Sequence, residues 1–124
     1  MEGGYKMDNP IWVMSSAFPG RTLQEVIERT REIGAQGIEV CVFRQGGTRN
    51  DHIATHLEYE DFGPEQAQGV IDLFNGNGLR LSVGAYDNLI GGDAETRVPN
   101  QDHILRLIAN LLNNKTFLAA LYCY

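Results

Sequence analysis

A single carboxylate interrupts an otherwise apolar run near the middle of the chain. Glu39 lies inside residues 38–43, which have the composition of a strand covered on both faces by helices. Burying an unpaired carboxylate is costly, so this side chain must reach a partner, a metal, a ligand or water. In a parallel barrel alternate residues of a strand point inward, which would place Glu39 in the mouth as a substrate-binding residue. An ion pair with Arg44 or Arg80 is the alternative, and the sequence leaves both open.

Two histidines lie in a long polar segment that follows this run. His52 and His56 are accompanied there by four acidic residues, Asp51, Glu58, Glu60 and Asp61. No set of three or four ligands with metal-site spacing emerges, so solvated loop charges are expected and no metal site is predicted within the chain. His56 is the better candidate for contact with a polar substrate, because Leu57 and Tyr59 would anchor its segment.

A third polar group follows the apolar residues 79–86. Tyr86, Asp87 and Asn88 stand where a third strand should end, and polar side chains at that edge of a β/α fold can bind hydroxyl groups. We therefore predict Tyr86 and Asp87 as substrate-binding residues, although Asp87 could instead cap the turn. His103 falls in the expected first turn of a later helix, and we expect it at the surface.

The elements that must position these residues repeat along the chain. Apolar runs at residues 11–18, 38–43 and 79–86 each precede a polar turn and a helical pattern. Thr22 and Glu25 have the spacing of a capping box, and Pro64 suits the first position of a second helix. Residues 115–124 are apolar enough for a fourth strand. The pattern predicts an α/β fold with a parallel sheet, in which three βα units and this fourth strand form half of a TIM-type barrel.

Length and charge limit the classes of protein. The chain has 124 residues, about half of the ~250 in a closed eight-stranded barrel. Residues 1–10 are expected to form a flexible arm, and residues 11–124 one partial barrel domain. The net charge of −6 argues against nucleic-acid binding, because such proteins concentrate Lys and Arg on one face.

The remaining composition favours a soluble protein of the cytoplasm. No stretch approaches the ~20 apolar residues of a membrane span, so no membrane partner is expected. Cys41 and Cys123 have neither metal-ligand nor disulfide-framework spacing, which is typical of reducing cytosol.

Three segments carry a resemblance to a known family. They are Ser15-Ser16-Ala17-Phe18, Gly34-Ala35-Gln36-Gly37-Ile38-Glu39-Val40 and Leu81-Ser82-Val83-Gly84-Ala85-Tyr86. Together they resemble the N-terminal half of sugar phosphate isomerases/epimerases of the xylose-isomerase-like barrel superfamily. The resemblance covers residues 11–112, whereas residues 113–124 depart from the expected fourth unit and suggest truncation.

The resemblance implies a function and a cofactor. In that family a divalent metal (Mn, Mg, Co or Zn), bound by Glu, Asp and His from later strands, polarises the oxygens of a sugar or sugar phosphate. Those strands are missing here, so we expect the chain to be inactive alone. Glu39, Tyr86 and Asp87 correspond to the first half of the pocket wall.

Two other functions stay open. One is a noncatalytic ligand-binding module that forms a homodimer through its open sheet edges, since unpaired strands are sites of association. The other is a relative of abasic-site endonucleases, which the acidic charge and the absence of a histidine at positions 86–88 disfavour.

Overall fold

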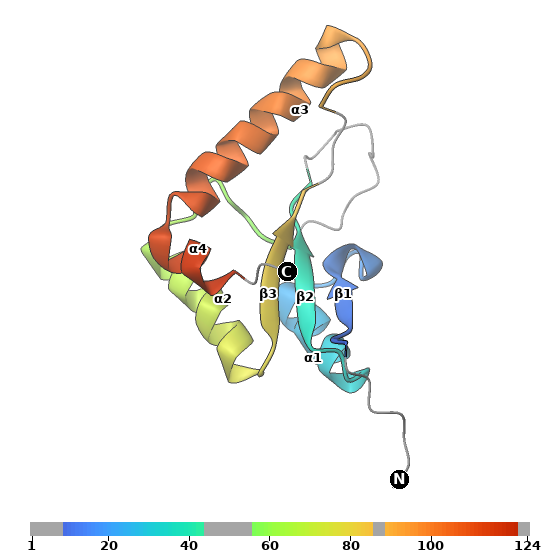
Figure 1. Cartoon of the computed structure of the whole chain (residues 1–124), viewed down its shortest axis with the longest axis vertical. Coiled ribbons are helices and arrows are strands. Elements are labelled where there is room, and N and C mark those ends of the chain that lie inside the picture. The colour runs from blue at the N-terminus through green and yellow to red at the C-terminus, as the bar shows by residue number, and fades with distance from the viewer. Residues whose placement is uncertain (1–8, 44–55, 86–88, 122–124) are drawn as a thin grey trace, which may run out of the picture.

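The fold is organised around three short parallel strands. The computed structural model describes residues 9–43, 56–85 and 89–121. Within them, β1 (Trp12–Met14), β2 (Gly37–Cys41) and β3 (Arg80–Gly84) form one sheet in the order β1-β2-β3 (Figure 1). Both pairs are parallel. The predicted α/β fold with a parallel sheet is confirmed, and it is consistent with part of a β/α barrel.

The first two helices begin where local sequence signals place them. Helix α1 (Leu23–Glu32) starts with a complete capping box: Thr22 Oγ1 accepts from the Glu25 N–H at 3.2 Å, and the Glu25 carboxylate accepts from the Thr22 N–H at 2.8 Å. Helix α2 (Pro64–Gly76) has its proline at the first helical position, where a missing N–H costs nothing. Both predictions are confirmed.

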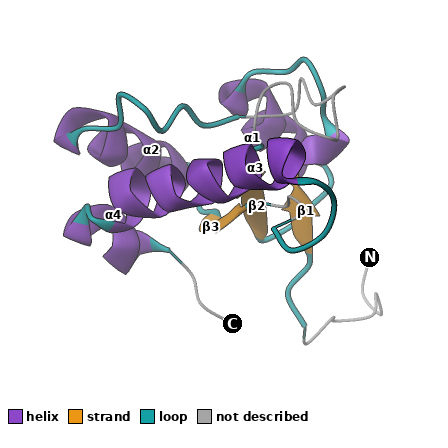
Figure 2. Cartoon of the chain, turned by 90° about the horizontal axis from the view of Figure 1, so that it is seen from above, coloured by secondary structure: helices purple, strands orange, loops and turns teal. Residues whose placement is uncertain are grey.

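The core lies on one face of the sheet. Ile38, Val40 and Leu81 belong to the same buried cluster as Ile27 of α1 and Phe74 of α2. Figure 2 shows α1 and α2 on the same side of the strands. Because side chains alternate along a strand, the residues between these core positions point to the opposite side, which we call the second face. It comprises Trp12, Met14, Gly37, Glu39, Cys41, Arg80, Ser82 and Gly84.

The predicted fourth strand is wrong for residues 115–120, which form helix α4 (Lys115–Ala120). The Asn114 side chain caps this helix by accepting from the Phe117 N–H at 3.0 Å. Phe117 is fully buried and packs edge-on against Phe62, with ring centroids 4.7 Å apart. A short apolar run fits a buried helix as well as a strand, which is why periodicity misled the prediction. Within the described part of the predicted strand, which ends at residue 121, Leu121 makes a parallel bridge to Leu81.

The third helix begins earlier than expected. Helix α3 (Ala94–Leu107) starts at the cap residue Asp93, whose side chain accepts from the Thr96 N–H at 3.0 Å, and it contains Pro99. It continues as a π-helical segment, η2 (Ile108–Leu112). The residues predicted to open the helix therefore lie in its second half, and His103 is buried rather than at the surface.

A 3-10 turn completes the described elements. Segment η1 (Ser15–Ala17) ends the first strand earlier than the apolar run predicts. Most of the predicted N-terminal arm, with residues 1–8, and the segment 44–55 with Arg44 and His52 lie outside the described residues.

Candidate functional site

Glu39 occupies the second face of the sheet at the centre of β2. It is in register with Met14 of β1 and Ser82 of β3, and its side chain is partly buried. The carboxylate lies over Gly84, where an added Cβ would overlap it and come within 2.9 Å of Glu39 Cδ. The absence of a side chain at position 84 therefore lets Glu39 extend across β3 at its carboxyl end.

Two further groups flank Glu39 on this face. The Ser82 hydroxyl is buried and has no hydrogen-bond partner in the described part of the chain. The Trp12 indole lies over Gly37, where a Cβ would stand 2.6 Å from Trp12 Cε3. Buried hydroxyl groups are normally paired, so this one is unusual, but its oxygen is too buried to touch a ligand directly. The second face thus offers a carboxylate acceptor and an aromatic surface.

His56 lies elsewhere, at the carboxyl end of β1 and β2. Its backbone N–H donates to the Cys41 carbonyl at 3.1 Å. Nε2 is 3.1 Å from the Phe18 carbonyl and Nδ1 is 3.0 Å from Ser15 Oγ. A carbonyl only accepts, so Nε2 carries the proton, and in the neutral ring Nδ1 accepts from the Ser15 hydroxyl.

The Ser15 hydroxyl forms hydrogen bonds both to the backbone of β2 and to the His56 ring. Its Oγ accepts the Cys41 N–H at 2.8 Å, which continues the β1-β2 hydrogen bonding after the backbone of β1 has turned into η1. The residue is fully buried. A nucleophile must reach its substrate, so the Ser15-His56 pair is structural rather than catalytic.

The described contacts do not bring Glu39 and His56 together. Glu39 faces away from the helices, whereas His56 lines a groove of about 300 Å³ with Phe62 and with Val70 of α2. Both ring nitrogens of His56 are bonded within the chain, so its contact with a substrate stays a prediction. Tyr86 and Asp87 lie outside the described residues, and their predicted roles stay predictions too.

A divalent metal does not fit the residues seen in the structure. Over residues 9–43, 56–85 and 89–121, no three His, Cys, Asp or Glu side chains are grouped so that they could hold one. We therefore derive no chemical step through a metal on this chain.

The sequence missed a second histidine, which joins α3 to the sheet. His103 is 4% exposed; its Nε2 donates to the Val42 carbonyl at 3.1 Å, and its Nδ1 accepts from the Tyr59 hydroxyl at 2.9 Å. Burial, and then the Glu60 carboxylate, raise the pKa of Tyr59 above its ordinary value of 10.0. Spacing was an available signal, because His103, Leu107 and Leu111 recur every four residues on one helical side.

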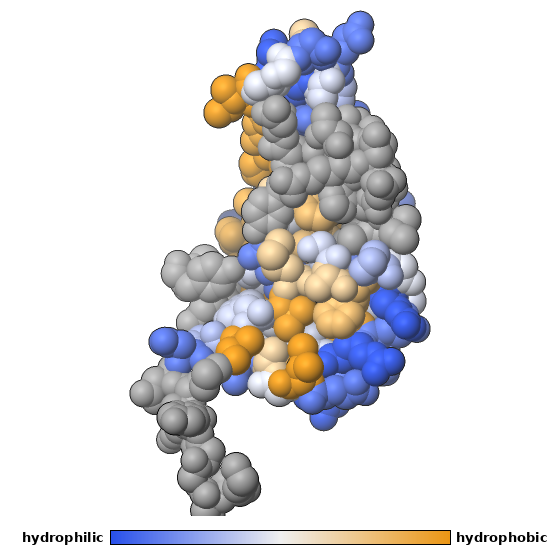
Figure 3. All heavy atoms as spheres, turned by 90° about the vertical axis from the view of Figure 1, so that its right-hand side faces the viewer, coloured by the Kyte–Doolittle hydropathy of each residue, from blue (hydrophilic) through white to orange (hydrophobic). Residues whose placement is uncertain are grey.

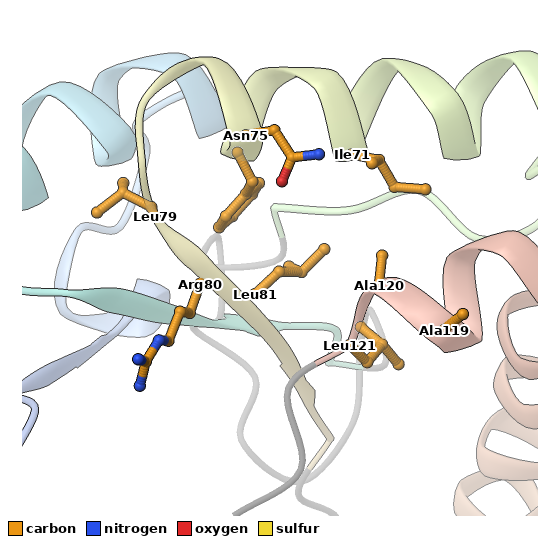
Figure 4. Close-up of a pocket in the computed structure, with 9 residues that line it drawn as sticks. Ile71, Asn75, Leu79, Arg80, Leu81, Ala119, Ala120 and Leu121 are labelled. Atoms are coloured by element: carbon orange, nitrogen blue, oxygen red, sulfur yellow. The ribbon is translucent and has the colours of Figure 1, made fainter.

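A separate cavity of about 280 Å³ lies between α2, β3 and α4, near the start of β3. In Figure 4, Ile71, Leu81, Ala120 and Leu121 surround the space between these elements, whereas Arg80 points away. Most of its lining residues are apolar, with Asn75 and Arg80 as the polar ones, and it includes none of the predicted site residues.

None of the helices in the described ranges is both long and apolar enough to cross a membrane. Comparison of the chain with protein-family models, curated proteins and solved structures finds no match.

Proposed function

We propose that this chain forms the first part of the sugar-binding wall of a metal-dependent sugar or sugar-phosphate isomerase/epimerase, and that its 124 residues do not catalyse alone. One observation carries the proposal: the partly buried Glu39 carboxylate extends over Gly84 at the carboxyl end of β3, on the second face of the sheet. A cytosolic protein goes with this proposal, because Cys41 is a free, buried thiol.

The groups on the second face match the chemistry of a sugar. A carboxylate such as that of Glu39 accepts hydrogen bonds from vicinal hydroxyl groups. An indole supplies apolar area against the C–H face of the ring, as Trp12 could do. Ligand sites in β/α folds lie at the carboxyl ends of the strands, toward which Glu39 extends.

A noncatalytic sugar-binding module is the second candidate. The same observation favours it, because binding needs only the wall and no metal centre. Pairing of two such modules through open strand edges belongs to this candidate. Both candidates, the isomerase/epimerase part and the noncatalytic module, should bind a sugar. Turnover distinguishes them only in a protein that also holds the metal ligands.

Fluorescence of Trp12 tests the binding step directly, because it is the only tryptophan of the chain. Titration with aldoses, ketoses and their phosphates is expected to give a saturable change in emission. Glu39→Gln should weaken binding about tenfold, since replacing a charge-assisted hydrogen bond (about 1.5–3 kcal/mol) by a neutral one (about 0.5–1.5 kcal/mol) costs about 1.4 kcal/mol. Glu28→Gln, at an exposed position of α1, is the matched control and should bind like the wild type.

Three results would refute the proposal. A flat titration with every sugar, or equal binding by the Glu39→Gln protein, would remove the role of the second face. Isomerase turnover by the purified chain with added Mn²⁺, Mg²⁺ or Co²⁺ would refute the claim that the metal ligands lie outside it. Incision of an abasic duplex would instead favour the endonuclease relationship.

A further inference from the structure

Asparagine is followed by glycine at two places in the chain, and the two pairs are consecutive. Asn75-Gly76 and Asn77-Gly78 lie where helix α2 ends and the chain turns into β3 (Figure 1). The backbone nitrogen of a glycine can attack the side-chain carbonyl of a preceding asparagine, because no side chain on the glycine shields that nitrogen. The sequence makes the two pairs equally reactive, whereas the structure holds them differently.

The first pair belongs to the helix itself. Asn75 and Gly76 are the last two residues of α2, where a backbone N–H donates to the carbonyl four residues earlier. The Asn75 carbonyl in turn accepts the Gly78 N–H at 3.1 Å. Turning the Asn75–Gly76 peptide therefore breaks a bond of the helix together with a bond of the turn that follows.

The second pair forms that turn. The Gly78 N–H bonds the Asn75 carbonyl, and the Leu79 N–H donates to the Phe74 carbonyl at 3.0 Å, which is the Schellman arrangement. Gly78 has a φ of 65°, in the left-handed region that glycine tolerates best. A flip of the Asn77–Gly78 peptide breaks only the first of these two bonds, because glycine absorbs the change in φ. The second pair therefore opens through a smaller movement than the first.

In the closed turn the reacting atoms of the second pair are kept apart. Asn77 has a ψ of 2°, which places the Gly78 nitrogen in line with the Asn77 nitrogen and a third of a turn away from Cβ. Ring closure needs that nitrogen beside Cβ. The side-chain amide is also held, since Nδ2 donates to the Leu73 carbonyl at 2.7 Å and Oδ1 accepts from Arg31 of α1 at 3.1 Å. Reaction therefore requires the peptide to flip and the amide to leave Arg31.

Water has access to this turn. Asn77 is partly buried, whereas Gly78 and Arg31 are exposed. Figure 3 shows hydrophilic atoms gathered at the height that α1, the helix of Arg31, has in Figure 1. A reaction at Asn77 that consumes water is therefore not blocked by burial.

We propose that Asn77 is a site of spontaneous deamidation, that Arg31 restrains the reaction, and that Asn77 is modified before Asn75. In the flipped peptide the Gly78 nitrogen attacks Asn77 Cγ. The N–Cγ bond forms, the Cγ–Nδ2 bond breaks, and the former amide proton leaves with Nδ2 as ammonia. Water then opens the succinimide at either carbonyl, which gives aspartate or isoaspartate at position 77.

Both products weaken the end of α2. Aspartate can still accept from Arg31, but it no longer donates to the Leu73 carbonyl, and its negative charge lies at a helix C-terminus. Isoaspartate adds one carbon to the main chain inside the turn, so the two Schellman bonds no longer fit. We expect the joint between α2 and β3 to loosen as the protein ages, independently of sugar binding.

Peptide mapping by mass spectrometry tests the order of modification. The folded chain and the chain in urea are incubated side by side at mildly alkaline pH, and fragment ions separate position 75 from position 77. In the folded chain Asn77 should be modified about tenfold faster than Asn75, because it opens through a smaller local movement. In urea the two rates should agree within about twofold, since only the fold distinguishes the pairs.

Variants of α1 test the restraint. Arg31→Ala should speed the modification of Asn77 about threefold by removing a charge-assisted hydrogen bond. Arg29→Ala is the matched control, because Arg29 is also exposed on α1 but pairs with Glu32, and it should leave the rate unchanged. Equal rates in the two variants would overturn the role of Arg31.

Two further results would overturn the site itself. One is a folded chain that stays unmodified at position 77 while the chain in urea is converted there. The other is modification of Asn75 at the same rate as Asn77, or faster, in the folded chain.

Discussion

His103 connects three parts of the chain through two hydrogen bonds. Its ring lies between the Val42 carbonyl, just after β2, and the Tyr59 hydroxyl, and it also packs edge-on against the Tyr59 ring at a centroid distance of 5.2 Å. A buried histidine with both nitrogens engaged is a structural residue, and its loss leaves two polar groups without partners.

Replacement of this histidine should therefore destabilise the fold. We expect His103→Ala to lower the free energy of unfolding by about 2–3 kcal/mol, measured by urea denaturation. Asp102→Ala, which removes a neighbouring exposed carboxylate paired with Arg106, should cost less than about 1 kcal/mol. Equal losses in the two proteins would contradict the role given to the imidazole.

Tyr59 predicts how stability changes at alkaline pH. Its pKa is raised in the folded chain, by burial first, so the neutral phenol is favoured by folding. That stabilisation is complete below pH 10 and is lost as pH rises through the raised pKa. Tyr59→Phe should cost about 1 kcal/mol at pH 7 through the lost hydrogen bond. Between pH 10 and 11.5 the Tyr59→Phe protein should lose less of its free energy of unfolding than the wild type does, because it has no phenol to ionise. Urea denaturation at each pH measures this loss. If the two proteins lose stability in parallel, ionisation of Tyr59 is not the cause.

At the scale of elements, two glycines show separately how close packing and helix propensity affect the stability of the fold. Gly37 in β2 is covered by the Trp12 ring, whereas Gly69 in α2 is exposed and nothing lies within 4 Å of an added Cβ. Adding a methyl group should therefore lower the stability of the fold at Gly37 and raise it at Gly69.

Gly37→Ala should destabilise the chain by about 1–3 kcal/mol, because the ring or the strand must move. Gly69→Ala should stabilise it by about 0.5–1 kcal/mol, since alanine loses less backbone entropy in a helix. Thermal unfolding checks both. Trp12 emission should change with the first substitution and stay unchanged with the second.

At the scale of the whole molecule, the sheet separates the core from the proposed sugar contact. Helices α1 and α2 pack on one face, and Glu39 lies on the second face.

The sequence by itself determined the local features. The capping box of Thr22 and Glu25, the first turn at Pro64 and the apolar strands follow from side chains a few residues apart, and all are present. Short-range chemistry decides such features, so a single sequence carries them.

Only the tertiary structure decided the rest. Residues 115–120 form a helix because this places Phe117 against Phe62, 55 positions earlier in the chain. His103 is buried because its imidazole hydrogen-bonds the carbonyl of Val42, 61 positions earlier in the chain. Glu39 extends over Gly84 because β2 and β3 pair in one particular register. Each outcome depends on which distant residues meet, and periodicity along the chain does not encode that.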